Sequence, residues 1–308
     1  MKNYLVTGGA GFVGSAIAHK LIKNGHSVYI IDNLSTGYME NVPIEAKLIV
    51  GDCSKIDTII ELKNQHFDAI FHIAGQSSGE ISFEDPIYDI QCNTVSTLQL
   101  LKYALKTGCR KIIYSSTMSV YGDHEKQMVS ELDETNPKSF YAVGKFASEC
   151  YLKLFNKNYD IDFVALRYFN IYGPGQNMAN MKQGMVSIYL KQIIDNEFKN
   201  VIVKGSLERF RDFVYIDDIV NITIEALENM KMNNLILNVG TGVKTTVNRV
   251  IELLMKETNI KKEIIVEDST LGDQFGIYSN SDLLISCCGY EFKSFENGIK
   301  QFVKSLDH

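Results

Sequence analysis

Short apolar runs alternate with longer segments whose apolar residues recur at helical spacing over the first half of the chain. The short runs predict strands at residues 4–6, 27–31, 48–50, 69–73, 111–114 and 163–166. The longer segments predict helices at 12–24, 88–105 and 141–156, and Gly25 and Gly108 mark the ends of the first two. Apolar strands that alternate with helices are typical of right-handed βαβ units in a parallel sheet buried on both faces.

After Arg167 this alternation becomes less regular. Residues 170–184 are rich in Gly, Asn and Met and predict a surface loop. Helices are predicted at 185–196, 217–228 and 246–258, and short strands at 201–203, 236–239 and 264–266. We therefore predict an α/β protein with a doubly wound parallel sheet over residues 1–168, to which the chain returns near 211–240. A smaller, partly interleaved α/β domain is expected within 169–308.

Composition narrows the functional classes. The 308 residues carry 31 Lys and Arg against 37 Asp and Glu, and a net charge of -6 without a basic run argues against nucleic-acid binding. No apolar stretch approaches the ~20 residues that span a bilayer, and the N-terminal run is too short for a signal peptide, so we expect no membrane association. The six cysteines show no CxxC spacing, which predicts reduced thiols, no metal site and a cytoplasmic protein.

A glycine-rich segment follows the first predicted strand and opens the first predicted helix. It reads Thr-Gly-Gly-Ala-Gly-Phe-Val-Gly over residues 7–14 and satisfies G-x-G-x-x-G through Gly9, Gly11 and Gly14. Glycines permit a tight turn, and backbone N–H groups at a helix start suit a pyrophosphate. The segment therefore predicts a dinucleotide-binding, Rossmann-like domain. The expected contacts are Gly8, Gly11, Phe12, Val13 and Gly14.

Asp32 ends the second predicted strand, where the adenosine ribose is expected to lie. A carboxylate there accepts hydrogen bonds from the ribose hydroxyls and repels a 2′-phosphate. No arginine follows within residues 33–37, so the sequence favours NAD over NADP. The alternative for Asp32 is a simple turn cap. The expected cofactor contacts here are Asp32, Asn33, Ser35, Thr36 and Gly37.

Two further strand ends supply candidate cofactor contacts. Asp52 follows the third strand, with Cys53 beside it, and suits an adenine amino group, although a helix N-cap is an equal alternative. His72 ends the fourth strand and is predicted to be a structural histidine rather than a catalyst. The small residues after it would let the backbone lie against the cofactor, and the expected contacts are Ile73, Ala74, Gly75 and Gln76.

Tyr141 and Lys145 form a Tyr-x-x-x-Lys motif at the start of a predicted helix. Their spacing places both side chains on one face, and a lysine cation lowers the pKa of a nearby phenol. Alone, this motif is common and typical of an exposed pair. However, a hydroxyl-rich segment at 115–119 follows the fifth strand, at the edge where ligands bind parallel sheets. A hydroxyl there can bond an alcohol that is being oxidised.

Together these motifs resemble the extended short-chain dehydrogenase/reductase family, in its nucleotide-sugar epimerase and dehydratase branch. The similarity to UDP-glucose 4-epimerases covers nearly the whole chain and includes the segments 167–174 and 211–218. It implies NAD-dependent oxidation of a sugar hydroxyl, usually at C4, in a homodimer that pairs through the helices at 88–105 and 141–156. In this resemblance Tyr141 is the base, Thr117 is its hydroxyl partner, and Lys145 tunes Tyr141 and binds the nicotinamide ribose.

The resemblance also extends the set of expected contacts. Besides Tyr141 and Lys145, it adds to the cofactor contacts Asn93, Ser115 and Tyr168. For the nucleotide-sugar substrate it implies contacts from Gln76, Thr117, Met118, Ser119, Asn170, Val186 and Arg211.

The chain departs from the family pattern at several positions. Met118 and Ser119 stand where 4,6-dehydratases carry Asp-Glu, so expulsion of a 6-hydroxyl is disfavoured, and decarboxylation equally. The lysine that the family carries after the fourth strand is replaced in the segment that begins with Gln76. Residues 270–273 lack a phosphate-binding arginine of the family pattern, and residues 183–186 lack its usual asparagines. The segment 72–82 is similar to enzymes of bacterial capsule heptose clusters.

These departures leave three readings of the function. The sequence favours a dehydrogenase that oxidises C4 of a GDP-heptose-like sugar to a 4-keto product in surface polysaccharide biosynthesis. The alternatives are a UDP-hexose 4-epimerase that uses transient C4 oxidation, and a non-catalytic NAD-binding protein on the same fold.

Overall fold

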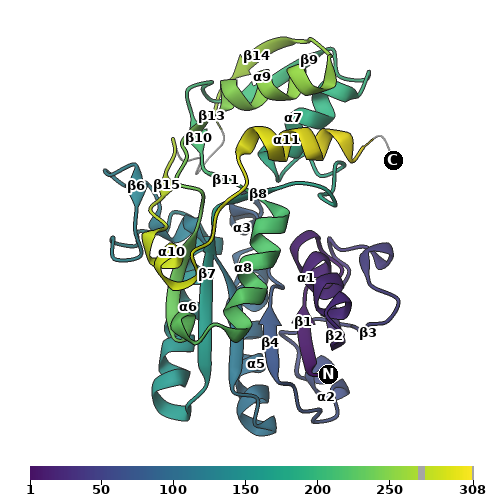
Figure 1. The fold of residues 1–308 in the computed structure, drawn as a ribbon, viewed down its shortest axis with the longest axis vertical. Coiled ribbons are helices and arrows are strands. Elements are labelled where there is room, and N and C mark those ends of the chain that lie inside the picture. Colours follow the sequence, from purple (N-terminus) through teal and green to yellow (C-terminus); the bar gives the residue numbers. More distant parts are fainter. Residues whose placement is uncertain (270–274, 307–308) are drawn as a thin grey trace.

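The molecule has two layers, and a parallel sheet of seven strands forms the centre of the larger one (Figure 1). The computed structural model describes residues 1–269 and 275–306. The strands are β1 Asn3–Thr7, β2 Ser27–Asp32, β3 Lys47–Val50, β4 Ala69–His72, β5 Lys111–Thr117, β7 Asp162–Tyr168 and β12 Leu235–Val239. They lie in the order β12-β7-β5-β4-β1-β2-β3, and every pairing between them is parallel. This confirms the predicted Rossmann-like, doubly wound sheet.

The order of the strands reverses beside β1. From there the chain first runs outward through β2 and β3, and then returns to build β4, β5, β7 and β12 on the other side. Thr7 at the end of β1 is level with Ile31 on β2 and His72 on β4. The carboxyl ends of these central strands therefore form one edge, and the reversal opens the crevice there in which such sheets bind ligands.

Helices cover both faces of the sheet, and its central strands are buried on both sides. On β1, Tyr4 and Val6 belong to the core under α1 (Phe12–Lys23) and α8 (Ile216–Glu228). Leu5, between them, belongs to the core under α5 (Ser96–Thr107) and α6 (Phe140–Tyr159). This alternation follows from the two-residue period of a strand.

A smaller layer lies beyond the carboxyl ends of the strands, at the top of Figure 1. It contains α7 (Met185–Ile194), α9 (Val247–Thr258), α11 (Phe295–Lys304) and the parallel pair β9 (Asn200–Lys204) and β14 (Glu263–Glu267). Val201 and Val203 alternate along β9 and are fully buried. The chain leaves this layer to form α8, which packs beside α1, and β12, which joins the sheet, and then it returns. Segments of the two layers therefore alternate along the sequence.

Several elements differ from the sequence prediction. The helix predicted at 88–105 consists of α4 (Pro86–Ile90), a π-helical turn at Gln91–Val95, and α5, which ends at Gly108 with a φ of +76°. The loop predicted at 170–184 begins with a strand, β8 (Asn170–Tyr172), which pairs with β11 (Phe213–Tyr215). The elements that the sequence did not predict also include α2 Ile56–Glu61, α3 Gly79–Glu84, α10 Asp282–Cys288, α11, and the short strands β6 Met128–Val129, β10 Phe210–Arg211, β13 Thr245–Thr246 and β15 Tyr278–Ser279.

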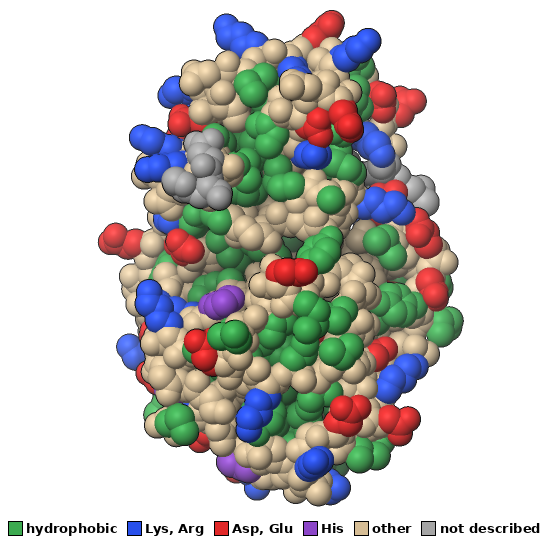
Figure 2. Space-filling view, turned by 90° about the vertical axis from the view of Figure 1, so that its right-hand side faces the viewer, with side chains coloured by type: hydrophobic (Ala, Val, Ile, Leu, Met, Phe, Trp, Pro, Cys, Tyr) green, Lys and Arg blue, Asp and Glu red, His purple; other side chains and the backbone are tan. Residues whose placement is uncertain are grey.

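Positive and negative side chains are mixed on the face drawn in Figure 2, as the nearly balanced charges of the sequence lead one to expect. Lys and Arg side chains there are interspersed with Asp and Glu rather than gathered into one basic patch. Across residues 1–269 and 275–306, no helix has the length and apolar character needed to cross a membrane.

Candidate active site

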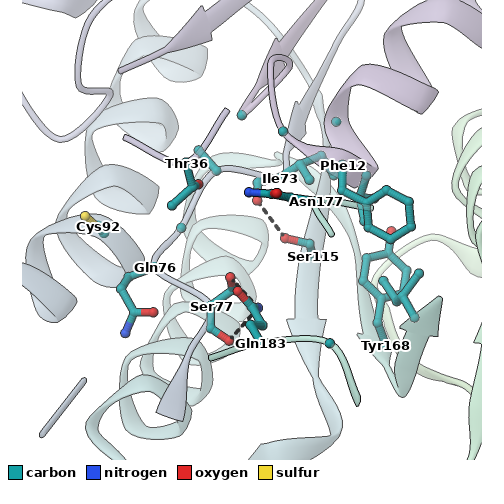
Figure 3. A pocket seen from close by; sticks show the side chains of 18 of the residues that line it. Phe12, Thr36, Ile73, Gln76, Ser77, Cys92, Ser115, Tyr168, Asn177 and Gln183 are labelled. Carbon is teal, nitrogen blue, oxygen red and sulfur yellow. Dashed lines mark hydrogen bonds between the residues drawn. The ribbon is translucent and has the colours of Figure 1, made fainter. Parts of the chain in front are cut away.

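A cavity of about 870 Å³ lies at the carboxyl edge of the sheet. Its walls come from the segments that follow β1, β2, β3, β4, β5 and β7, and from the start of α7. The loop at residues 173–184 forms another part of its wall. Figure 3 shows this cavity with Phe12 and Tyr168 near one another, and Thr36, Ile73 and Ser115 around its middle. Sequence positions far apart therefore meet at the predicted edge.

The glycine turn after β1 has no room for side chains. Gly8 has a φ of +72°, and a Cβ there would lie 2.8 Å from the Ala74 nitrogen. A Cβ on Gly14 would lie 2.1 Å from the Gly8 carbonyl oxygen. Gly11 is the N-cap of α1 and provides no side-chain cap, so the first N–H groups of α1 stay available at the cavity wall. This cradle fits a pyrophosphate group.

Asp32 lines the cavity at the end of β2. Its Oδ2 accepts a hydrogen bond from the Ala10 N–H at 2.9 Å, and its Oδ1 accepts one from the Leu34 N–H at 2.8 Å. The side chain therefore caps the turn and faces the cavity at once. Asn33, Ser35 and Thr36 also line the cavity.

Gly37 does not line the cavity, although the sequence placed it among the cofactor contacts. A Cβ on Gly37 would lie 2.8 Å from the Ala10 carbonyl carbon, so this glycine lets the loop after β2 pack against the glycine turn. The Tyr38 N–H then donates to the Ala10 oxygen at 3.0 Å. Tyr38 itself does line the cavity.

Asp52 and Cys53 line the cavity after β3. The Asp52 Oδ1 accepts from the Ser54 N–H at 2.8 Å, whereas the N-cap of α2 is Lys55. The helix-cap alternative for Asp52 is therefore wrong. Burial raises the pKa of the Cys53 thiol to about 12, so this thiol is neutral at physiological pH.

His72 ends β4 and is buried between Thr7 of β1 and Thr97 of α5. Its Nδ1 lies 2.9 Å from the Thr7 hydroxyl and its Nε2 lies 3.0 Å from the Thr97 hydroxyl. Burial, followed by the charge of Lys145, lowers the pKa of His72 to about 3. A neutral histidine with both nitrogens bonded has the structural role that the sequence favoured. Beyond it, the cavity is lined by Ile73, Ala74, Gly75 and Gln76.

Thr117, Tyr141 and Lys145 all line the cavity. Thr117 ends β5, and its Oγ1 accepts from the Ser119 N–H at 3.2 Å. Tyr141 lies in the first turn of α6, which Ser139 caps through the Ala142 N–H. The Lys145 Nζ donates to the Ser115 carbonyl oxygen at 2.8 Å.

Burial is the largest influence on the pKa of Tyr141 among the protein groups. Burial raises the pKa of Tyr141 to about 12; a hydrogen bond with Thr117 acts in the opposite direction, and the charge of Asp89 raises the pKa further. Burial lowers the pKa of Lys145 to about 8. Among the protein groups the desolvation of the phenol dominates, and the lowering of the Tyr141 pKa that the sequence expected from Lys145 together with a bound nicotinamide cofactor stays a prediction.

Most of the predicted substrate residues line the same cavity, but Arg211 does not. Met118, Ser119, Asn170 and Val186 line the wall, and the Asn170 Nδ2 donates to the Asp212 carbonyl oxygen at 3.3 Å. Arg211 lies off the wall on β10, where its Nη1 donates to the carbonyl oxygens of Phe210 at 2.8 Å and Phe275 at 3.2 Å. Residues 270–273, where the sequence lacks an arginine of the family pattern, lie outside the described residues.

Asn93 also lies behind the wall rather than on it. Its Nδ2 donates to the Gln76 carbonyl oxygen at 3.0 Å and to the Asp89 Oδ1 at 3.1 Å. Asn93 therefore supports the segment after β4 from the π-helical turn. Of the other predicted cofactor residues, Ser115 and Tyr168 line the cavity.

The family resemblance placed the segment 183–186 at the substrate, but the sequence missed the wall contributed by the rest of the loop at 173–184. The Asn177 Nδ2 donates to the Tyr38 hydroxyl at 2.9 Å, and the Gln183 Nε2 donates to the Ser77 hydroxyl at 2.8 Å (Figure 3). No hydrophobic period marks this loop, so only its contacts across the cavity reveal it. The sequence also missed Ile81, Tyr88 and Cys92, which line the cavity from the α3–α5 region.

Comparisons with known proteins agree with this architecture. The sequence profile of the NAD dependent epimerase/dehydratase family matches residues 4–240. A putative UDP-glucose 4-epimerase of Methanocaldococcus jannaschii is 35% identical over 275 residues, which are 89% of this chain and 88% of that protein. A UDP-glucose 4-epimerase of Mycolicibacterium smegmatis is 34% identical over 79% of this chain and 78% of its own.

Two solved structures are similar over almost the whole chain. The UDP-glucose 4-epimerase of Thermotoga maritima, solved with UDP-glucose, has a TM-score of 0.94 and 34% identity, covering 99% of this chain and 98% of its own. The UDP-glucose 4-epimerase of Thermus thermophilus, solved with NAD, has a TM-score of 0.90 and 30% identity, covering 99% of both chains.

Proposed function

Because this chain belongs to the NAD-dependent epimerase/dehydratase family and is an NAD-dependent nucleotide-sugar enzyme, we propose that it inverts C4 of a UDP-linked sugar. The observation that carries the proposal is that Thr117, Tyr141 and Lys145 line one cavity together with the glycine cradle. Several relatives bear the name UDP-glucose 4-epimerase, which supports a UDP-sugar over other nucleotide sugars.

The residues that line the cavity fit NAD, and different residues would bind the cofactor and transfer the proton. The N-terminus of α1 would bind the pyrophosphate and Asp32 the adenosine ribose, and bound NAD supplies a hydride acceptor and donor. Tyr141 would take the proton of the C4 hydroxyl and later return it to the 4-keto oxygen. Thr117 would hold the same oxygen through its hydroxyl, while Lys145 adds positive charge beside the phenol.

A phenol with a pKa of about 12 is protonated at neutral pH, so Tyr141 needs additional positive charge to act as a base. Lys145 lies one helical turn after Tyr141, and the positively charged ring of bound NAD would add the further charge beside it. We therefore expect the proton transfer to depend on the ammonium form of Lys145.

The second candidate is the 4-dehydrogenase for a GDP-heptose-like sugar that the sequence favoured. The specific observation for it is that no lysine projects from the segment after β4. Gln76 there bonds the Ser78 carbonyl oxygen at 2.7 Å and Asp89 at 2.9 Å. The two candidates share the oxidation at C4 and differ in whether the hydride returns to the sugar.

The test is to incubate the purified protein with UDP-glucose, UDP-galactose, UDP-N-acetylglucosamine and a GDP-heptose, and to analyse the products by NMR and mass spectrometry. We expect a C4 epimer of a UDP-sugar and no accumulation of reduced cofactor. A 4-keto product with reduced NAD from the GDP-heptose would instead establish the second candidate. No turnover of any of these sugars would refute both.

Tyr141→Phe tests the assigned base. We expect a loss of turnover on the order of 10²–10⁴-fold with little change in NAD binding, because only the proton-transferring hydroxyl is removed. Tyr159→Phe, at the exposed end of the same helix, is the matched control and should keep full activity. A Tyr141→Phe variant with the rate of the wild type would exclude Tyr141 as the base.

We also propose that the protein is a homodimer. Phe140, Val143 and Leu154 lie on one face of α6 and are 47%, 50% and 53% exposed. Leu105 on α5 adds a further exposed apolar side chain, whereas Leu101 is part of the core. Pairing of these helices between two copies would cover them. Light scattering should give twice the 34.8 kDa mass of one chain, and a monomeric mass would refute the proposal.

A further inference from the structure

Asp89, on α4, is a buried carboxylate to which neither the sequence nor the proposed mechanism assigns a role. It is 1% exposed. Its Oδ1 accepts hydrogen bonds from the Gln76 Nε2 at 2.9 Å and the Asn93 Nδ2 at 3.1 Å. Its Oδ2 has no hydrogen-bond partner among the described residues. A carboxylate buried without full satisfaction is costly, which points to a role beyond packing.

The free side of Asp89 faces the helix that carries the candidate catalytic pair. A Cβ on Gly144, the residue before Lys145, would lie 3.4 Å from the Asp89 Oδ2. The π-helical turn at Gln91–Val95 places Asn93 next to both groups. A Cβ on Gly75 would lie 2.5 Å from the Asn93 Oδ1 and 3.1 Å from the Lys145 Nζ. Asp89, Asn93 and Lys145 therefore form one buried polar cluster behind Gly75.

The other titratable groups that face Lys145 are neutral at physiological pH. Burial lowers the pKa of His72 on β4 to about 3, and it raises those of Cys53 and Tyr141 to about 12. Burial also raises the pKa of Cys92 in the π-helical turn and that of Tyr114 on β5, whose ring centroid lies 4.9 Å from the Lys145 Nζ. Asp89 is a carboxylate and differs in this respect from all the groups named above.

The Asp89 and Lys145 charges stabilise each other. Burial raises the pKa of Asp89, while its hydrogen bonds and the charge of Lys145 act against that rise. Burial lowers the pKa of Lys145 to about 8, and Asp89 is the first of the groups that oppose this shift. A buried ammonium group needs a compensating negative charge nearby to remain protonated.

We propose that Asp89 is a positioning residue of the active site, which fixes Gln76 and Asn93 and provides the buried negative charge that keeps Lys145 in its ammonium form. This inference deepens the proposed function, because it concerns the same Lys145. Asp89 would act through Lys145 and Gln76 and would touch neither the sugar nor the cofactor, in agreement with its position behind the cavity wall.

The test compares Asp89→Asn with Asp85→Asn in the full chain. The amide oxygen of the first variant can still accept from Gln76 and Asn93, so it removes the charge and retains the hydrogen bonds. Asp85 lies one turn earlier as the exposed N-cap of α4, and asparagine caps a helix as well as aspartate does, so this control removes the same charge elsewhere. Trace acetylation with acetic anhydride across pH 6–11, read by mass spectrometry, measures the titration of Lys145 without requiring turnover.

We expect the midpoint of Lys145 to fall by about one unit or more in Asp89→Asn and to stay unchanged in Asp85→Asn. The alkaline limb of the kcat/KM profile should move to lower pH by a similar amount. An unchanged Lys145 titration in folded Asp89→Asn overturns the proposal, even if activity falls. If that variant does not fold, Asp89→Ser is read in the same way; unfolding of both would assign Asp89 to stability and also overturn it. A shifted titration in a protein that turns over no sugar supports this inference and refutes only the proposed function.

Discussion

Gly14 offers a direct test of the cradle, because its environment leaves no space for one more carbon atom. A Cβ there would lie 2.1 Å from the Gly8 oxygen, 2.7 Å from the Gly8 carbonyl carbon and 3.1 Å from the Gly9 Cα. All three atoms are backbone, so no side chain can rotate away. In Gly14→Ala, α1 and the glycine turn must separate by about 1 Å or more to reach ordinary van der Waals contact.

Such overpacking costs about 1–3 kcal/mol. The separation moves the N–H groups of the turn and of α1 apart, and these are the groups expected to bind the pyrophosphate together. If the whole cost appears in binding, the affinity for NAD falls roughly 5- to 150-fold.

Isothermal titration of the NAD-free protein with NAD measures this loss, and circular dichroism reports whether the fold is retained. Gly79→Ala is a suitable control, because a Cβ there meets only the Ser139 side chain, at 3.6 and 3.7 Å. It should bind NAD as the wild type does. Equal NAD affinity in folded Gly14→Ala and in the wild type would show that the close packing of this turn does not shape the cofactor site.

Two further predictions concern the stability of the fold. Arg167→Met removes the cation that binds Glu149 through Nε at 2.9 Å and Nη2 at 2.7 Å, and the buried, unpaired carboxylate should cost about 3–5 kcal/mol in urea unfolding. Adding Glu149→Leu should recover most of that loss, and no recovery would contradict the reasoning. The pKa of His72 is about 3 in the folded chain, so between the unfolded value near 6.5 and pH 3 the unfolded state binds the proton first and stability falls with falling pH. His72→Gln should therefore lose less stability than the wild type between pH 7 and pH 5; equal losses would mean that His72 does not contribute to acid unfolding.

The sheet could be predicted because its signals are local. Each strand is a short apolar run, the glycine turn links β1 to α1, and the alternation of strands and helices sets the parallel order. The cavity residues at the strand ends follow from the same rule, since carboxyl ends of parallel strands share one edge. For this reason Asp32 and Thr117 could be placed at one site from the sequence, whereas Tyr141, in the first turn of α6, was placed there by the family resemblance.

The elements that were missed depend on contacts distant in the sequence. β8 is three residues long and exists because it pairs with β11 more than 40 positions later. The π-helical turn leaves no mark in the apolar pattern, since it changes the hydrogen-bond register and not the residue types. Asp89 looks like an exposed helical aspartate until α4 packs against α6. Arg211 is a substrate contact by the family resemblance, yet its guanidinium donates to the backbone oxygens of Phe210 and Phe275, which do not line the cavity.

The loop at residues 173–184 bears on the choice between the two candidate reactions. It crosses the cavity and is held on the far side by three contacts: Asn177 to Tyr38 at 2.9 Å, Gln183 to Ser77 at 2.8 Å, and Lys182 to Glu84 at 3.2 Å. A dehydrogenase that exchanges its reduced cofactor for a fresh one in every cycle would require a path past such a loop. An epimerase returns the hydride to the sugar and keeps its cofactor, so it gains from a loop that slows release. The contacts across the cavity therefore favour the epimerase over a dehydrogenase that exchanges its cofactor in solution.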